Sequence, residues 1–172
     1  MKTKKILLGT LLVLILSALY HDIYELFPNT ITSFFFPIDE SIWEHNKMIL
    51  LAFITWAILE KISMKSSKNS LFKNLVACVT TIILVLTIFT PVFLFLLNKN
   101  DNLFVTLTIY TISIVIGFTL SEKIDLADCP KLEFLSSIGF ALLVVTFAIM
   151  TYYHPNNILF EDYTKISNRQ TR

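Results

Sequence analysis

The sequence predicts an all-α polytopic membrane protein, a single helix bundle with about five transmembrane helices. Hydrophobic residues make up 55% of the 172-residue chain and charged residues only 16%, against roughly a quarter in soluble domains. The hydrophobic residues gather in runs long enough to cross a bilayer, which takes roughly 20 residues. The lysines concentrate in particular connections between these runs. A chain of this length predicts one domain, covering residues 1–172.

The first apolar run covers residues 5–20 and follows a cluster of lysines. It is similar to the core of a signal peptide, but Tyr20 stands where cleavage requires a small residue, so we expect an uncleaved helix. The later spans are predicted at residues 48–62, 75–97, 103–120 and 134–153. Pro91 falls inside the third of the five spans and removes a backbone donor, which predicts a kink there.

Lysine placement predicts the orientation of the bundle. The connection KISMKSSKNSLFKN, between the second and third spans, is strongly basic, and basic connections remain in the cytoplasm. We therefore expect a multi-pass protein of the cell membrane with its N-terminus inside and its C-terminus outside. This arrangement gives an outer loop at 21–47 and an outer tail at 154–172. Membrane lipids are the expected partners, whereas a net charge of +1 argues against nucleic acid.

The segment FFFPIDESIWEHNKM places acids and a histidine at the edge of the second span. If a helix begins soon after Pro37, Glu40 and Glu44 lie four residues apart on one face, and Ser41 and His45 share a neighbouring face. Carboxylate and imidazole groups at such spacings can bind a divalent metal or act as general acid and base. The segment therefore predicts a candidate site.

A structural interpretation of the same segment stays open. Ser41-x-x-Glu44 is the pattern of a capping box, and the acids suit the positive end of a helix dipole. Trp43 suits the aromatic belt at a membrane interface. Capping does not require both Glu40 and His45, so we favour a functional site.

The predicted orientation places all three histidines, His21, His45 and His154, at the outer face. The apolar triplet at residues 158–160 predicts that the tail folds back, which would bring His154 and Asp162 towards His45. An ordinary interfacial tail is the alternative. Ionisable residues are nearly absent from the middle of the spans, which argues against an ion-coupled transporter.

The string PIDESIWEH, residues 37–45, resembles the motif P-[VI]-[ND]-E-S-[VI]-W-E-H of a family of small bacterial multi-span membrane proteins of unknown function. Asp39 stands where we expect Asn in that motif. The family is also similar in a histidine near the end of the first span, here His21, and in a Leu-Phe-x-Asp tail that ends here at Asp162. The resemblance implies no established activity, but it strengthens the functional interpretation because a generic cap needs no such string.

The favoured hypothesis is a membrane-embedded enzyme, metal-dependent or not, that acts on a lipid or lipid-linked substrate. Its expected catalytic residues are Glu40, Glu44, His45 and His154, and its expected binding residues are Ser41, Trp43 and Asp162. The expected ligands of a divalent metal such as zinc are His21, His45 and His154. Two alternatives stay open: a non-catalytic immunity, stress or assembly factor that binds a partner or lipid headgroup, and a small permease.

Overall fold

The structure is a computed structural model that describes residues 2–63, 68–93 and 102–162, and its regular elements in these ranges are helical. This confirms the predicted all-α class. The elements are α1 (Lys2–His21), α2 (Ile23–Leu26), α3 (Thr30–Phe35), α4 (Ile42–Ser63), α5 (Ser70–Leu84), the π-helical turn η1 (Val85–Phe89), α6 (Leu103–Lys123), α7 (Pro130–Tyr152) and the 3-10 turn η3 (Ile158–Phe160). The predicted end of the third span after residue 93 and the tail from residue 163 lie outside the described residues.

Four segments of the described chain are long and apolar enough to cross a membrane: Thr3–Leu26, Ser70–Phe89, Leu103–Lys123 and Pro130–Tyr152. These segments coincide with the first, third, fourth and fifth predicted spans. Four such helices are typical of a multi-pass membrane protein. The second predicted span, residues 48–62, lies within α4, which is not among the four. Polar and charged residues at both ends of α4 lower its hydropathy, although its middle is apolar.

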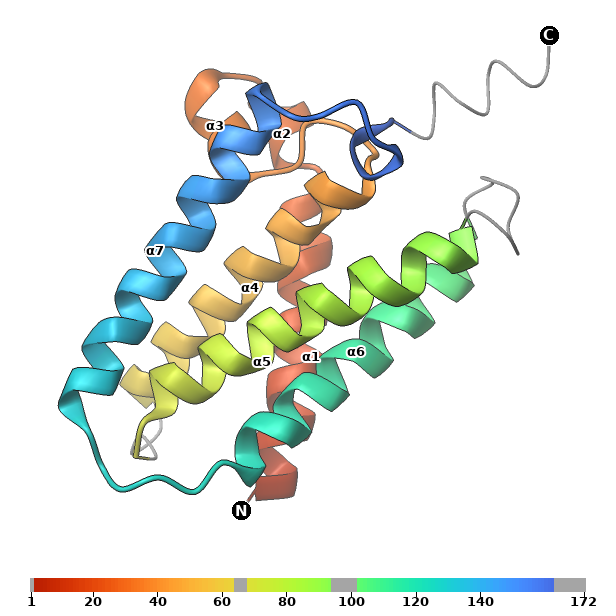
Figure 1. The fold of residues 1–172 in the computed structure, drawn as a ribbon. Coiled ribbons are helices and arrows are strands. Elements are labelled where there is room, and N and C mark those ends of the chain that lie inside the picture. Colours follow the sequence, from red (N-terminus) through yellow and green to blue (C-terminus); the bar gives the residue numbers. More distant parts are fainter. Residues whose placement is uncertain (1, 64–67, 94–101, 163–172) are drawn as a thin grey trace, which may run out of the picture.

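Helix α4 occupies the middle of the bundle and packs on α1, α5 and α7 (Figure 1). Its apolar residues form much of the core, where Phe53 and Trp56 pack against Phe118 of α6. Its charged residues Glu44, Lys47 and Glu60 are buried inside the protein. The helices around α4 carry most of the large exposed hydrophobic side chains, which suits them to contact lipid.

Helices α5 and α6 lie side by side (Figure 1). Their close approach requires a glycine, because a Cβ atom on Gly117 would lie 2.6 Å from the backbone oxygen of Ala77. A π-helical turn, Val85–Phe89, lies just before Pro91, the residue at which a kink was expected. A proline that lacks its donor commonly distorts the preceding turn in this way.

The connection between α1 and α4, called the outer loop after its expected orientation, contains the short helices α2 and α3. These helices lie at the same end of the bundle as the C-terminus of α7 (Figure 1). Asn29 caps α3, since its side chain accepts hydrogen bonds from the backbone N–H groups of Ile31 and Thr32. Helix α3 rests on α7, where the hydroxyls of Ser33 and Tyr152 share a hydrogen bond. This loop covers the N-terminal end of α4.

A charged cluster at the opposite end ties four helices together. The Lys5 ammonium of α1 lies 2.7 Å from a Glu60 oxygen of α4 and 2.6 Å from a Glu122 oxygen of α6. Asn74 of α5 donates a hydrogen bond to Glu60. Both carboxylates are buried, so the partners compensate charges that would otherwise be costly to remove from water.

Candidate metal centre

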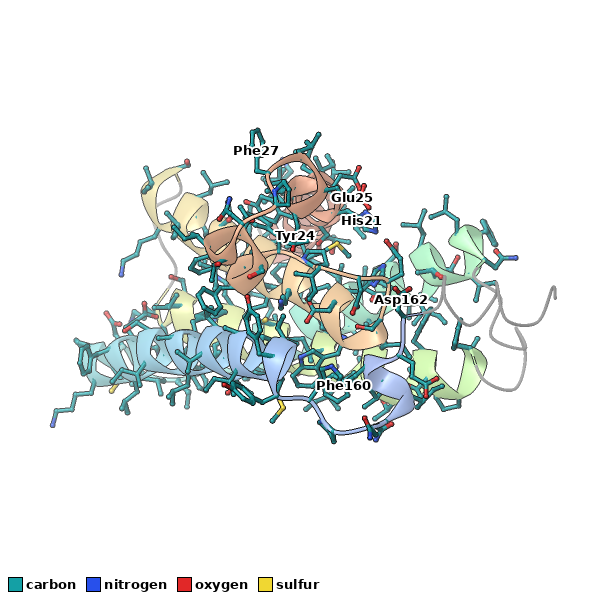
Figure 2. The ribbon with its side chains drawn as sticks, turned by 90° about the horizontal axis from the view of Figure 1, so that it is seen from above. His21, Tyr24, Glu25, Phe27, Phe160 and Asp162 are labelled. Atoms are coloured by element: carbon teal, nitrogen blue, oxygen red, sulfur yellow. The ribbon has the colours of Figure 1, made fainter. Side chains whose placement is uncertain are left out.

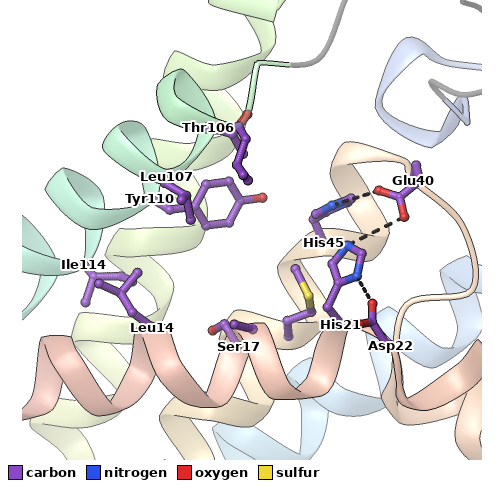
Figure 3. A pocket seen from close by; sticks show the side chains of 13 residues that line it. Leu14, Ser17, His21, Asp22, Glu40, His45, Thr106, Leu107, Tyr110 and Ile114 are labelled. Atoms are coloured by element: carbon purple, nitrogen blue, oxygen red, sulfur yellow. Dashed lines mark hydrogen bonds and ion pairs between the residues drawn. The ribbon is translucent and has the colours of Figure 1, made fainter. Parts of the chain in front are cut away.

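Three potential metal ligands converge where α1 ends and α4 begins. His21 is the last residue of α1, His45 lies in the first turn of α4, and Glu40 lies in the connection before it. One ligand atom from each lies within 4.8 Å of the other two. His21 Nε2 is 3.6 Å from one Glu40 oxygen, and His45 Nε2 is 3.3 Å from the other (Figure 3). Segments that are distant in sequence thus form one group.

The cap of α4 places Glu40 in this group. The Glu44 backbone N–H donates to Ser41 Oγ at 3.2 Å, and the Ser41 N–H donates to Asp39 Oδ1 at 3.0 Å. The helix therefore begins at Ile42 and Ser41 caps it. The predicted capping box is only half formed, because the Ser41 N–H donates to Asp39 and not to the Glu44 carboxylate. Glu40 precedes the helix, so the face that Glu40 and Glu44 were expected to share does not form. Because Glu40 lies outside the helix, its side chain can face His21 at the end of α1.

The second nitrogen of each imidazole is already occupied. His45 Nδ1 lies 2.8 Å from the carbonyl oxygen of Ser41, and His21 Nδ1 is hydrogen-bonded to Asp22. Both oxygens can only accept, so Nδ1 carries the proton in each ring, and a neutral ring has its lone pair on Nε2. Both Nε2 atoms face Glu40. With both rings neutral, two lone pairs and a carboxylate would face one another, an arrangement that a cation or a proton on Nε2 would bridge.

Glu40 supplies the negative charge of the group. Hydrogen bonding to His21, and then to His45, holds the pKa of the Glu40 carboxyl well below its usual range. The carboxylate is therefore ionised at neutral pH and down to mildly acidic pH.

The group offers donor atoms of the kind that could hold a divalent metal such as zinc. Zinc binds histidine nitrogen and carboxylate oxygen at roughly 2.0–2.2 Å, so neighbouring ligands of a tetrahedral site lie roughly 3.3 Å apart. The nitrogen–oxygen distances of 3.3 and 3.6 Å are near this value, but each is measured to a different Glu40 oxygen. With one ligand atom from each residue, the three atoms lie within 4.8 Å of one another. The Nδ1 contacts with Asp22 and Ser41 are the outer contacts that metal-binding histidines generally make.

The candidate ligands His21, Glu40 and His45 are called the metal group below. A cavity of about 400 Å³ adjoins this group between α1, α4 and α6 (Figure 3). His21, Asp22, Glu40 and His45 line one end of it. The remaining walls are largely apolar and come from α1, α4 and α6: Leu14, Ala18, Met48, Leu103, Leu107 and Ile114, with Ser17, Thr106 and Tyr110 as polar members. The volume lies within the usual range of ligand pockets, roughly 300–1,000 Å³.

Glu44, a predicted catalytic residue, lies in a different cluster. It is buried and pairs with Lys47 at 2.7 Å, while the Thr151 hydroxyl and the Ile38 N–H donate to its carboxylate. Lys47 in turn donates to the backbone oxygen of Ser33. Burial raises the pKa of the Glu44 carboxyl, and the Lys47 ammonium counteracts this shift. The pair connects α4 to α3 and α7 and does not join the metal group.

The tail folds back onto the bundle, as expected, but does not bring His154 to the other histidines. Phe160 of η3 packs on Trp43, with ring centroids 5.0 Å apart, and Trp43 stacks on Phe147 of α7 at 4.5 Å. His154 is exposed and stacks on Phe160, the ring that packs on Trp43. Seen from above, Phe160 lies apart from His21 (Figure 2). Asp162 is likewise not a member of the metal group.

Sequence reasoning missed several contributors to the site. Asp22 was not among the predicted site residues, although its position next to His21 in the sequence was a signal. Ser17 and Tyr110 line the cavity but resemble the many other hydroxyl residues of the spans. Lys47 was predicted to lie in the outer loop, although its spacing of three residues from Glu44 suits an ion pair within a helix.

Comparison with known proteins gives a family and no activity. No curated protein and no solved structure matches the chain. One family model matches residues 1–169, and it is described as a family of unknown function, DUF6512. The match extends over nearly the whole chain, far beyond the nine-residue string at 37–45 that carried the resemblance. The chain therefore belongs to the DUF6512 family of unknown function.

Proposed function

We propose that the protein is a membrane-embedded, metal-dependent enzyme that acts on a lipid or lipid-linked substrate. The observation that carries the proposal is the convergence of His21, Glu40 and His45 on one point at the polar end of an apolar cavity. Neither feature alone would indicate catalysis. Together they offer a metal site and a place for an apolar substrate beside it.

Zinc is the expected metal. Two imidazoles and one carboxylate form a ligand set that zinc enzymes use, and three protein ligands leave a fourth position for water. When bound, the metal supplies an activated water for attack on an ester or phosphoester. Asp22 and the Ser41 carbonyl orient the two histidines. The group lies at the end of a predicted span, so it would meet a lipid near its headgroup.

The chain's other residues would position the substrate. The apolar walls of the cavity would bind its hydrocarbon part and exclude water. The Tyr110 hydroxyl points towards the histidine end of the cavity (Figure 3), where it could donate to a substrate oxygen. With the expected orientation, the site would open at the outer face of the cell membrane.

A reconstitution assay tests the activity. The protein is placed in vesicles of a total bacterial lipid extract, stripped with a chelator or reloaded with zinc, and the lipids are analysed by mass spectrometry. We expect zinc-dependent products that lack an acyl chain or a headgroup. His45→Ala should abolish them, whereas His154→Ala, a histidine outside the group, should not. Equal product from the His45→Ala protein, or none from the zinc-loaded wild type, would contradict the proposal.

A second candidate, a non-catalytic factor that binds a partner or lipid headgroup, has one observation in its favour. The outer loop beside the metal group exposes Phe27 and Ile31, at 65% and 70% of their surface. In that case Phe27→Ser and Ile31→Ser would abolish the cellular phenotype, and His45→Ala would leave it unchanged. The enzyme hypothesis predicts instead that His45→Ala abolishes the phenotype and that Phe27→Ser and Ile31→Ser leave it unchanged.

A further inference from the structure

The cavity beside the metal group extends along two helices as a narrow groove. On α1 its lining runs from His21 to Leu14, a distance of roughly 10 Å at 1.5 Å per residue. On α6 the lining residues recur at intervals of three and four from Leu103 to Ile114, so they form one stripe of that helix. The groove therefore leads from a charged end into the apolar part of the bundle.

One buried polar group on this groove lacks a partner. Ser17 is 8% exposed, and its hydroxyl has no hydrogen-bond partner within the described part of the chain. Many other hydroxyls in these helices donate to a carbonyl of their own helix, as those of Thr108, Thr111 and Ser136 do. Ser17 lines the cavity one helical turn from His21 (Figure 3). An unpaired buried hydroxyl is costly, and a ligand in the groove would satisfy it.

These features restrict the ligand. From Ser17 to Leu14 the lining of α1 spans roughly 4.5 Å at 1.5 Å per residue. This part of the groove holds about the first four carbons of a saturated chain, and a longer chain continues beyond it. A volume of about 400 Å³ is at the small end of ligand pockets, roughly 300–1,000 Å³, which suits one chain rather than two. The Ser17 hydroxyl lies one helical turn, roughly 6 Å, from His21. It can donate to a carbonyl oxygen at the head of that chain, with the polar end of the ligand between this carbonyl and the metal group.

We propose that the groove binds a single-chain amphiphile whose ester or amide carbonyl accepts a hydrogen bond from Ser17 and whose polar end lies at the His21–Glu40–His45 group. The inference rests on the proposed function, since it names the substrate class for that site. Binding of the chain itself needs only the groove and Ser17. Its test can therefore be separated from the test of metal binding.

The experiment is photo-crosslinking in nanodiscs, because most detergents are themselves single-chain amphiphiles. The probe is a monoacylglycerol with a ten-carbon chain and a diazirine on the fourth carbon of that chain, and intact-protein and peptide mass spectrometry give the extent and position of labelling. We expect saturable labelling on the groove faces of α1 and α6. Leu107→Trp, which fills the groove, should lower labelling at least tenfold. Leu142→Trp, on the exposed face of α7 outside the groove, should not.

A pair of ligands tests the role of Ser17. Ser17→Ala should weaken binding of the ester probe roughly five- to tenfold, the loss of one hydrogen bond. Binding of the matching alkyl ether, which lacks the carbonyl, should not change. Ser137→Ala is the control, since its exposed hydroxyl donates to its own helix. An equal loss for ester and ether would overturn the assignment of Ser17.

Bound zinc is measured in the same samples. In one outcome the wild type binds zinc, but its labelling is not saturable or is the same in Leu107→Trp. That outcome would overturn the groove proposal and leave the metal centre standing. Saturable groove labelling in a protein that binds no zinc would support the groove proposal and contradict the proposed metal-dependent enzyme. The two failures are therefore distinguishable.

Discussion

His21 and His45 each use their two ring nitrogens differently. Nδ1 is bonded to an oxygen that orients the ring, and Nε2 faces Glu40. This division is what a metal-binding histidine needs, because the outer contact sets the tautomer and raises the basicity of the ligand nitrogen. A helix cap would need neither histidine. At the scale of single residues, the segment at 37–45 therefore combines a cap, made by Ser41, with part of a candidate metal group that does not include Glu44.

Removing the outer contact of His21 should weaken metal binding without removing a ligand. Asp22→Ala is expected to lower zinc affinity about 10- to 100-fold, the usual effect of losing such a contact. Competition with a fluorescent zinc chelator measures it. Glu25→Ala changes a nearby exposed acid on α2 and should have no effect. An unchanged affinity in Asp22→Ala would show that Asp22 does not orient His21.

The Glu44–Lys47 pair should matter for stability and not for metal binding. Lys47→Met leaves a buried carboxylate unpaired and is expected to destabilise the protein by about 3–5 kcal/mol. Adding Glu44→Gln should restore much of the loss, because both charges are then gone. Thermal unfolding followed by tryptophan fluorescence measures these changes. Lys61→Met, which breaks an exposed pair with Glu133 at 4.0 Å, should leave the unfolding temperature unchanged.

Full zinc binding in both the Lys47→Met and the double-variant proteins would agree with a structural role for the pair. Loss of zinc from the folded double variant would contradict it and return Glu44 to the ligand set.

At the scale of helices, α4 differs from its neighbours. The other long helices are apolar enough to cross a membrane by themselves, whereas α4 carries buried charges at both ends. Glu44 and Lys47 compensate each other at one end, and Glu60 meets Lys5 and Asn74 at the other. The surrounding helices therefore provide what α4 needs to lie inside the bundle.

The contact between α5 and α6 depends on Gly117. A Cβ atom there would meet the backbone oxygen of Ala77 and Thr81 Oγ1, each at 2.6 Å. Gly117→Ala is therefore expected to destabilise the protein by about 1–3 kcal/mol through overpacking. The matched control is Gly139→Ala, where the close atom at 2.7 Å is a methyl end of the flexible Leu75 side chain. Thermal unfolding should separate the two, and equal unfolding temperatures would contradict this account of the helix contact.

Hydropathy alone predicted the helices well, because each span must present apolar side chains to lipid or to the core. It could not separate α4, whose middle is apolar, from the four candidate spans. The i, i+4 argument for Glu40 and Glu44 was wrong because the cap at Ser41 starts the helix after Glu40. His45 and His21 come together through packing of α4 on α1. No local pattern could show that His154 would stack on Phe160 instead.

At the scale of the whole molecule, the two ends of the bundle have different chemistry. One end holds the metal group and the outer loop, and the other holds the Lys5–Glu60–Glu122 cluster and the connection between α6 and α7. The expected orientation places the metal end outside the cell. A substrate would then reach the groove from the outer leaflet.

The native cysteines Cys129 and Cys78 allow the orientation of the protein in the membrane to be tested. Cys129, in the connection before α7, is partly exposed, whereas Cys78 is fully buried. A membrane-impermeant maleimide should therefore label the protein in inverted vesicles and not in intact cells, and Cys129→Ser should abolish labelling. Asn156→Cys in the Cys129→Ser background, on the exposed part of the tail, should be labelled in intact cells. Labelling of Cys129 in intact cells would contradict the orientation.

The most direct test of the central claim is the metal content of the purified protein after incubation with zinc and removal of excess metal. Elemental mass spectrometry should find one zinc per chain in the wild type and in His154→Ala. His21→Ala and His45→Ala should both lose it, because these residues lie on different helices and share one site. A wild type without zinc, or full zinc in the His45→Ala protein, would contradict the metal centre on which the proposed function rests.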